Sequence, residues 1–393
     1  QARAHFCAGN AHFEAGRLDA ARADYEAALR LVPGRASVLA NLGVTLCRLR
    51  QWQPALTTLD AALLADPTHA DAWAALGLSR EALGQWAGAV HALQRALALG
   101  AKSGLLNLSL AMCLLRLERL PEALDALDAA LALDPTLGEA WSQRGHLMRE
   151  AGHLAEAARC YRQALQHGAD DDFNRYCLAA VQDPRDPPPP PARYAQALFD
   201  EYADDFQDHL VGQLRYTAHE TLVAPLRRDG RRLARVLDLG CGTGLCGRLI
   251  APLADAVDGV DVSAAMVAQA RASGAYRSVA HDGLLPFLRA QSAPADLVLA
   301  ADVFIYVGAL DDVFAAVVPV LAPGGVFAFS VEQADAGRDL QLRPSLRYAH
   351  SRGLIERLAA QHGLRVRSID AGPIREDQRR PVMGWYALLE RPR

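Results

Sequence analysis

A glycine-rich string in the second half of the chain carries the clearest chemical pattern of this sequence. Residues 236–244 read Val-Leu-Asp-Leu-Gly-Cys-Gly-Thr-Gly, between a run typical of a strand and one typical of a helix. Gly240, Gly242 and Gly244 allow a tight turn that approaches a ligand without interference from a Cβ atom. Asp261 follows about twenty residues later, where a carboxylate can accept hydrogen bonds from ribose hydroxyls. The pattern predicts a site for a nucleoside or a dinucleotide.

Asp238, two residues before the first glycine, separates two ligands that such a turn could take. A carboxylate beside the pyrophosphate of a nicotinamide dinucleotide is repulsive. S-adenosylmethionine has no phosphate and carries a sulfonium and an ammonium group, so an acid suits it. The string Asp-Leu-Gly-Cys-Gly-Thr-Gly resembles the first motif of class I S-adenosylmethionine-dependent methyltransferases. A nicotinamide-dependent reductase is the competing interpretation.

The resemblance covers residues 200–393, with further motifs in the family's order. His281-Asp282-Gly283 resembles the end of the third strand. Residues 295–304 resemble the fourth-strand motif that faces methyl donor and acceptor, and residues 321–327 resemble the turn into the fifth strand. Residues 198–216 resemble the entry region of bacterial methyltransferases that carry tetratricopeptide (TPR) repeats.

The family resemblance also implies roles for individual residues. Asp238 would bind the methionine ammonium, Asp261 the ribose and Asp282 the adenine. The implied cofactor-binding residues are Asp238, Gly240, Cys241, Gly242, Gly244, Asp261, Val262, Met266, Asp282, Gly283 and Asp302. Structural alternatives exist for three of them. Asp261 can cap a helix before Ser263, Asp282 can form an Asp-Gly turn, and Cys241 is favoured as a small residue rather than a nucleophile.

Methyl transfer needs a general base only when the acceptor is a hydroxyl or an amine. The candidate catalytic residues are Asp302, Tyr306 and His350, with Tyr348 as a further candidate. Ordinary interpretations favour Tyr306 as a core aromatic residue and His350 as a solvated helix residue.

A run of charges near the end of the chain offers a second kind of acceptor contact. Arg375, Arg379 and Arg380 flank Glu376 and Asp377. Arginines can clamp an anionic acceptor. A solvated charge run is the favoured interpretation.

Alternating strand-like and helix-like runs predict the elements that position these residues. Strands are expected at 235–239, 256–262, 277–281, 296–301, 325–331, 364–369 and 383–389. Helices are expected at 245–254, 263–273, 309–321 and 350–361. This alternation predicts a mostly parallel sheet with helices on both faces. The last two strands lack an intervening helix, which predicts an antiparallel edge. Together with the family resemblance, these elements predict an α/β Rossmann-like class I methyltransferase domain with a seven-stranded sheet.

The first half of the chain repeats itself with a period of 34 residues. Glycines recur at Gly9, Gly43, Gly77 and Gly145, and small residues recur in register later in each unit. A period of this length indicates stacked helix pairs, and the spacing resembles the TPR repeat. The five expected units are 2–35, 36–69, 70–103, 104–137 and 138–171.

The domain organisation follows from these patterns. Residues 1–183 are expected to form a TPR solenoid with a capping helix at 172–183. A proline-rich linker occupies 184–191, where polyproline II structure is expected. A helical entry segment follows at 192–234, and the cofactor-binding methyltransferase domain occupies 235–393.

Composition limits the function classes. The 393 residues carry a net charge of −4, which argues against a nucleic-acid partner bound through bulk charge. No apolar run is long enough to span a bilayer. Gln1 lies within the first repeat and no signal-peptide pattern is present, so the sequence leaves open whether further repeats precede it. The cysteine usage predicts a cytoplasmic location. Seven cysteines without a CxxC pair predict reduced thiols and no metal site.

The resulting functional hypothesis is a methyltransferase whose solenoid recruits a protein or peptide through its groove. Concave solenoid surfaces suit that purpose. A small-molecule acceptor is the first alternative, since one fold serves many substrates. A TPR adaptor with an inactive or cofactor-sensing domain is the second, although the presence of Asp238, Asp261 and Asp282 argues against it.

Overall fold

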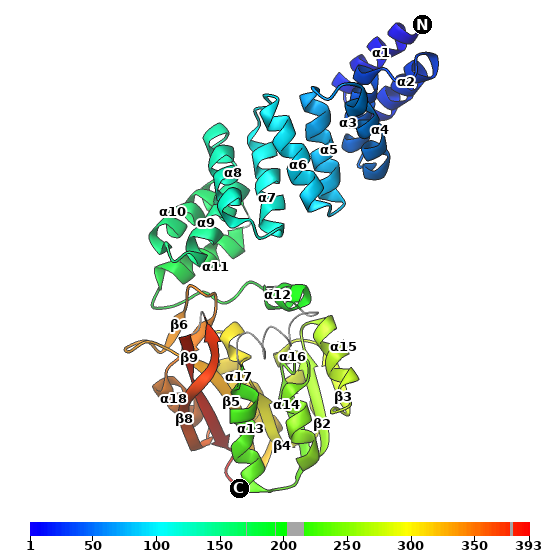
Figure 1. Cartoon of the computed structure of the whole chain (residues 1–393). Helices are drawn as coiled ribbons and strands as arrows, with labels where there is room; N and C mark the ends of the chain where they lie inside the picture. Colours follow the sequence, from blue (N-terminus) through cyan, green and yellow to red (C-terminus); the bar gives the residue numbers. More distant parts are fainter. Residues whose placement is uncertain (170, 193, 203–215, 378–379) are drawn as a thin grey trace. The chain divides into compact units, whose positions relative to one another are not determined.

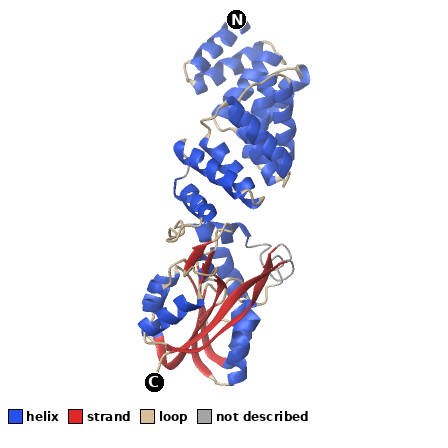
Figure 2. Cartoon of the chain, turned by 90° about the vertical axis from the view of Figure 1, so that its left-hand side faces the viewer, coloured by secondary structure: helices blue, strands red, loops and turns tan. Residues whose placement is uncertain are grey.

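The computed structural model describes the chain except for residues 170, 193, 203–215 and 378–379. It divides into two compact units, residues 1–174 and 175–393. The described part of the first unit is helical, and the second combines a sheet with helices on both faces (Figures 1 and 2). The division falls inside helix α11, the helix expected to cap the repeats.

Consecutive helices form the helix pairs of the first unit. They are α1 (Ala2–Glu14), α2 (Leu18–Leu31), α3 (Ala36–Arg48), α4 (Trp52–Ala65), α5 (Ala70–Ala82), α6 (Trp86–Ala98), α7 (Gly104–Arg116), α8 (Leu120–Leu133), α9 (Gly138–Glu150) and α10 (Leu154–Gln166), followed by α11 (Asp171–Gln182). Each of the five expected repeats contains one pair. The buried alanines of one repeat, such as Ala89 and Ala96, are fully covered, so the helix axes can approach closely.

The periodic glycines lie where the two helices of a pair touch. A Cβ atom on Gly43 would lie 2.5 Å from Cγ of Leu59, and one on Gly77 would lie 2.6 Å from Cγ of Leu93. Real Cβ atoms do not approach other heavy atoms so closely. The 34-residue glycine period therefore reflects the contact between the helices of each pair.

The second unit is built on a sheet of nine strands within the described residues. Its strands are β1 (Leu233–Leu239), β2 (Ala254–Asp261), β3 (Ser278–His281), β4 (Ala295–Ala300), β5 (Leu321–Gln333), β6 (Leu340–Leu342), β7 (Tyr348–His350), β8 (Arg365–Asp377) and β9 (Arg380–Glu390). The order is β3-β2-β1-β4-β5-β7-β6, with β9 beside β5 and β8 beside β9. Strands β1 to β5 pair in parallel, and β9 is antiparallel to both β5 and β8.

Helices cover both faces of this sheet (Figure 2). They are α13 (Ala218–Asp229), α14 (Leu245–Ile250), α15 (Ala264–Ala272), α16 (Leu284–Arg289), α17 (Asp311–Val320) and α18 (Arg352–Gln361), with short 3-10 turns at Ala251–Leu253 and Phe304–Tyr306. Helix α12 (Tyr194–Tyr202) lies at the end of the sheet (Figure 1). Neighbouring residues alternate between the two cores: Leu237 packs with α17 and α18, whereas Val236 packs with α13 and α14. This alternation is the strand period of two.

Three sequence expectations about these elements were wrong. The sheet has nine described strands rather than seven, because the hairpin of β6 and β7 has only three residues per strand. Strand β5 begins at Leu321, so the Pro323-Gly324-Gly325 segment expected to be a turn lies within the strand, at a register shift against β4. The expected helix at 350 begins at Arg352. Of the expected helical entry segment, residues 203–215 lie outside the described residues.

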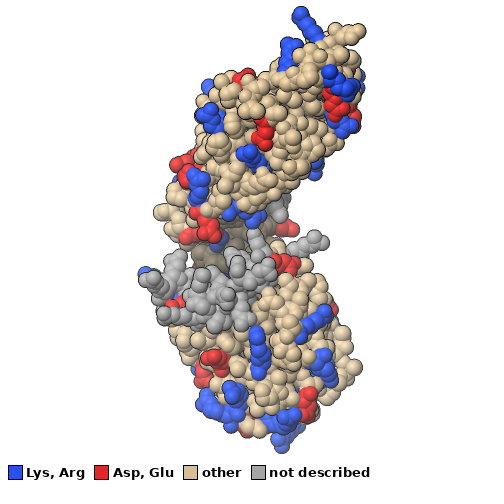
Figure 3. Space-filling view, turned by 45° about the vertical axis from the view of Figure 1, so that its right-hand side comes forward, with Lys and Arg blue, Asp and Glu red and all other residues tan. Residues whose placement is uncertain are grey.

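The surface carries charges of both signs. On the face shown in Figure 3, basic and acidic side chains are interspersed over both units rather than gathered by sign. Among the described helices, none combines the length and the apolar character that crossing a bilayer requires.

Candidate active site

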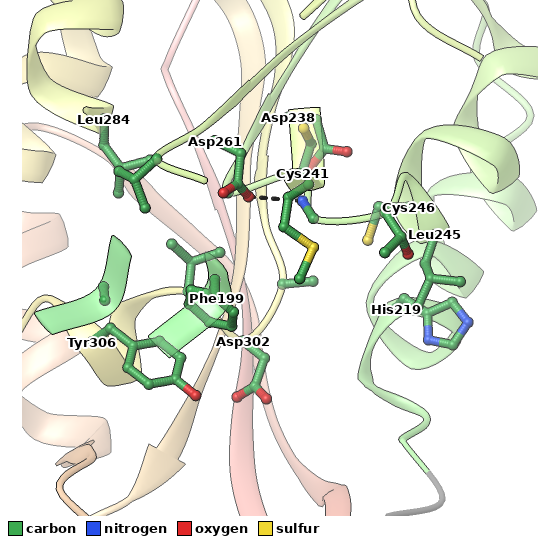
Figure 4. Close-up of a pocket in the computed structure, with 18 of the residues that line it drawn as sticks. Phe199, His219, Asp238, Cys241, Leu245, Cys246, Asp261, Leu284, Asp302 and Tyr306 are labelled. Atoms are coloured by element: carbon green, nitrogen blue, oxygen red, sulfur yellow. Dashed lines mark hydrogen bonds between the residues drawn. The ribbon is translucent and has the colours of Figure 1, made fainter. Parts of the chain in front are cut away.

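A cavity of about 380 Å³ lies at the carboxyl ends of β1, β2 and β4. This is the edge of an open α/β sheet where ligands bind. Its walls come from the glycine-rich turn after β1, the end of β2, the segment after β4, and helix α12, which contributes Leu198 and Phe199 (Figure 4). The volume falls within the range of small-molecule sites.

The glycine-rich turn adopts backbone angles that favour glycine. Gly240, Gly242 and Gly244 have φ values of 60°, 53° and 89°. A Cβ atom on Gly240 would lie 2.6 Å from Cγ2 of Val303, so a side chain there would collide with the segment after β4. A Cβ on Gly242 would meet nothing within 4 Å. The turn therefore leaves its backbone open toward the cavity.

Asp261 holds this turn in place from the end of β2. Its carboxylate accepts hydrogen bonds from the backbone N–H groups of Gly242 (2.9 Å) and Ser263 (3.0 Å). Burial raises the pKa of Asp261 against the opposing effect of these hydrogen bonds. The N-cap of α15 is Ser263, whose hydroxyl accepts from Met266 N, so the capping role considered for Asp261 belongs to the next polar residue.

Asp238 is almost completely buried beneath the turn, with 1% of its surface exposed. The hydroxyl of Tyr276 donates a hydrogen bond of 2.7 Å to its Oδ2 atom. Burial raises the pKa of Asp238 to about 7, and the charge of Asp261 adds to the rise while the Tyr276 hydrogen bond opposes it. Asp238 therefore changes charge near neutral pH in the unliganded protein.

Tyr276 is a site residue that the sequence analysis missed. Its ring fills space left by glycines: a Cβ atom on Gly259 would lie 3.0 Å from its Cε1 atom, and one on Gly247 would overlap the ring. Glycines on α14 and β2 were the only sequence signal of this packing. They allow the phenol to reach Asp238.

Asp302, two residues after the end of β4, has a strained backbone, and its N–H and carboxylate groups are both hydrogen-bonded. Its φ of 58° is left-handed, which is uncommon for a residue other than glycine. Its N–H donates to Oγ of Ser330 (2.9 Å), and its carboxylate accepts from Nη1 of Arg375 (2.8 Å). Strained residues of this kind concentrate at functional sites.

Arg375 links this segment to the end of β5. It is 3% exposed, lies on β8, and also donates from Nη2 to the carboxylate of Glu332. The interpretation of the late charges as a solvated run was therefore wrong for Arg375. Arg380 begins β9 and is exposed, and Arg379 lies outside the described residues.

The remaining predicted residues divide into those that line the cavity and those that do not. Cys241, Val262, Met266 and Tyr306 line it, and the Tyr306 ring meets that of Phe199 edge-on at 5.1 Å between centroids. The Cys241 thiol is buried, which raises its pKa and disfavours a role as nucleophile.

Asp282, Gly283, His350 and Tyr348 do not line the cavity. The carboxylate of Asp282 accepts from the Gly283 N–H at 2.7 Å, as expected for an Asp-Gly turn. His350 lies in β7 rather than in a helix, is fully buried, and donates from Nε2 to the Gly308 carbonyl oxygen at 2.7 Å. Burial lowers the pKa of His350 to about 4. Tyr348 is also buried and donates to the Pro188 carbonyl oxygen.

Family models match both units. Residues 237–327 match the model of a methyltransferase domain, and residues 12–78, 74–137 and 138–171 match models of the tetratricopeptide repeat. The chain joins TPR repeats to a methyltransferase domain. The last match has the same bounds as the fifth repeat expected from the sequence.

Individual proteins resemble parts of this chain. A malonyl-[acyl-carrier protein] O-methyltransferase of Enterobacter lignolyticus is 32% identical over 156 residues, which are 39% of this chain and 59% of that protein. The chain thus spans about three fifths of the relative's length. The N-methyltransferase NodS of Bradyrhizobium japonicum, solved with S-adenosyl-L-homocysteine, is 20% identical with a TM-score of 0.37, covering 44% of this chain and 86% of NodS. MamA of Desulfovibrio magneticus is 19% identical with a TM-score of 0.39, covering 42% of this chain and 94% of MamA.

The methyltransferase domain has further cavity residues that no motif identified. Tyr216 and His219 stack with 5.2 Å between ring centroids. His219 Nδ1 is buried without a hydrogen-bond partner in the described part of the chain, and burial lowers the pKa of His219. Arg347, just before β7, lines the cavity as well. Such isolated residues give no sequence signal, because only the fold brings them to the site.

The ionisable groups of the lining fall on different parts of the sheet edge. Asp238 and Asp261 follow β1 and β2, and the described lining there includes neither lysine nor arginine. Arg347 and Arg375 belong to the elements beyond β4. The wall at β1 and β2 therefore suits a cationic ligand without phosphates.

Proposed function

We propose that the protein is an S-adenosylmethionine-dependent methyltransferase whose TPR repeats recruit a protein or peptide substrate or partner. The observation that carries this proposal is the pair of buried carboxylates, Asp238 and Asp261, on either side of an open glycine-rich turn. A pyrophosphate would be repelled by the ionised form of either carboxylate, whereas a sulfonium nucleoside with an ammonium group is attracted to it.

Different residues around the turn would contact different parts of the cofactor. Asp238 would receive the methionine ammonium, Asp261 the ribose hydroxyls, and Met266 and Leu284 would offer apolar surface to the ligand. Asp282 would reach the adenine from the rim of the site. S-adenosylmethionine supplies an electrophilic methyl group on its sulfonium, and holding the acceptor in line with that group provides much of the rate.

The residues proposed for proton transfer differ in their availability. Asp302 would act through position rather than as a free base, because its carboxylate is engaged by Arg375. Tyr306 lines the cavity and remains a candidate for contact with the acceptor. His350 is directed to a backbone carbonyl and does not line the cavity, so the geometry does not favour it.

Exposed apolar side chains support the recruiting role of the repeats. Among the described residues, large exposed hydrophobic side chains are concentrated in the first unit, where Leu64 and Leu105 are 89% and 63% exposed. Such exposure often marks an interaction surface when the residues form a patch. The resemblance to an enzyme named for malonyl-[acyl-carrier protein] favours, as a second candidate, a small acceptor presented on a carrier protein.

Calorimetric titration tests the cofactor assignment. S-adenosylmethionine and S-adenosylhomocysteine are expected to bind, and NADH is not. A folded protein that binds neither nucleoside at about 1 mM would favour the adaptor alternative. Binding of NADH alone would establish the reductase.

The pKa of Asp238 predicts a pH dependence for cofactor binding. The affinity for S-adenosylhomocysteine should fall as the pH is lowered through about 7, because Asp238 takes up a proton and loses its attraction for the ammonium. Calorimetry in buffers of different ionisation enthalpy should show proton release on binding near pH 7. In Asp238→Asn the affinity for S-adenosylhomocysteine should be lower. Its remaining pH dependence should come only from the titration of groups on the ligand. An identical pH profile in this variant would contradict the assignment.

A further inference from the structure

Two hydrogen-bond donors on the cavity wall beyond β4, on Arg347 and Tyr306, have no acceptor within the described chain. Arg347, Tyr306 and Arg375 all line the cavity. Arg375 offers this wall no free donor, because both of its Nη atoms are engaged and its Nε atom is buried without accessible surface. The structure gives the Arg347 guanidinium and the Tyr306 hydroxyl no hydrogen bond or ion pair with any described residue. A buried donor without an acceptor is costly, so this wall is suited to a ligand that accepts hydrogen bonds.

Within the described residues Arg347 makes no direct salt bridge. Burial lowers its pKa, but the nearby Tyr306, Asp302 and Glu332 raise it by more. Arg375 pairs with both buried carboxylates, Asp302 and Glu332. Arg343 lies 3.7 Å from Glu332 and provides it with a second partner. The two buried acids therefore have two guanidinium partners. The remaining guanidinium, that of Arg347, lines the cavity and makes no direct salt bridge with either acid in the described part of the chain.

We propose that the methyl acceptor is a carboxylate, bound by Arg347 together with Tyr306. This inference rests on the proposed function. One carboxylate oxygen would accept from these donors, and the other would attack the methyl carbon. The new O–CH3 bond forms as the S–CH3 bond breaks, and the electron pair of that bond stays on sulfur. The products are a neutral methyl ester and the thioether S-adenosylhomocysteine, and no proton is released.

This chemistry matches the absence of a free base on the wall that the structure describes. A carboxylate is already ionised at neutral pH, so the reaction does not require the proton transfer that a hydroxyl or an amine would need. Figure 4 shows Asp302 and Tyr306 together on one side of the cavity and His219 on the other. An ammonium acceptor would be repelled by Arg347, and a neutral amide would leave its charge unpaired.

Binding to the full-length protein saturated with S-adenosylhomocysteine tests the carboxylate assignment. Malonate is the probe, its neutral analogue malonamide reports on the charge, and methylphosphonate reports on preference for a phosphate-like anion. The variant is Arg347→Gln, with Arg347→Lys to separate charge from the planar guanidinium. Arg352→Gln is the matched control, because Arg352 is exposed on α18 and pairs with Glu356.

Malonate is expected to bind the wild type and Arg352→Gln with equal affinity. Arg347→Gln should weaken it by at least about tenfold and Arg347→Lys by less, since lysine lacks the two-pronged geometry. Equal malonate affinity in wild type and Arg347→Gln, binding of malonamide as tight as malonate, or tighter binding of methylphosphonate would overturn the assignment. S-adenosylhomocysteine affinity should be the same in all four proteins. If S-adenosylhomocysteine did not bind the wild type, the result would instead contradict the proposed function.

Discussion

Arg375→Gln is expected to lower the stability of the second unit by about 3–5 kcal/mol. The reason is that Arg375 is the shared partner of two buried carboxylates, and its removal leaves both in a poorly hydrated environment. Glu332 would retain only the longer contact with Arg343, and Asp302 would keep none of its present ion pairs. Burial of an unpaired charge is among the largest effects that a single substitution produces.

Hydrogen exchange of peptides from β5, β8 and β9 measures this loss within the second unit. Arg380→Gln is the matched control, because Arg380 is exposed on the neighbouring strand, and it should change stability by less than about 0.5 kcal/mol. The triple variant Arg375→Gln, Asp302→Asn, Glu332→Gln should recover much of the loss, since neither buried carboxylate is then left without its guanidinium partner. A loss below about 1 kcal/mol in the single variant would show that the carboxylates are hydrated or protonated instead.

Asp261→Ala is expected to weaken S-adenosylhomocysteine binding by about 2–4 kcal/mol. Two effects add. The ribose hydroxyls would lose a charged acceptor, and the Gly242 N–H would lose the carboxylate that holds the glycine-rich turn. The loss should therefore exceed that expected for the ribose contact alone.

Calorimetry on matched variants separates these two contributions. Asp255→Ala is the control, because Asp255 lies near the start of the same strand and is largely exposed; it should leave affinity unchanged. Ser263→Ala removes the helix cap and the hydrogen bond from Ser263 Oγ to Asp200 of α12 without removing the Asp261 carboxylate. Loss of the cap should lower stability by about 1 kcal/mol. Affinity in Asp261→Ala equal to that of the wild type would mean that the ribose lies elsewhere.

The part of this site that sequence could predict is the part encoded locally. The glycine-rich turn and Asp238 lie within seven residues of one another, from 238 to 244, and their backbone requirements follow from residue type. Asp261 was placed by the length of one strand–helix–strand unit. The repeats were found because their glycine spacing is periodic and each glycine has the same packing role.

The part that could not be predicted depends on pairing between distant segments. Arg375 reaches Asp302 because β8 pairs with β9 and β9 with β5, which brings residues 73 positions apart together. Arg347 comes from a hairpin whose three-residue strands give too little alternation to recognise. His350 was assigned to a helix because the periodic pattern from 350 to 361 does not show where the helix begins. Ser351 is the N-cap of α18, so His350 lies before the helix.

The niche of Tyr276 has a consequence for how this sequence can diverge. Gly247 and Gly259 provide the room that the phenol ring occupies, and the ring is what brings a hydroxyl to Asp238. A larger residue at either glycine would displace the Tyr276 ring. A smaller residue at position 276 would leave a cavity and would leave the buried Asp238 without its hydrogen bond. These three positions lie on a helix, a strand and a loop. A substitution at one of them is therefore expected to require a compensating substitution at another.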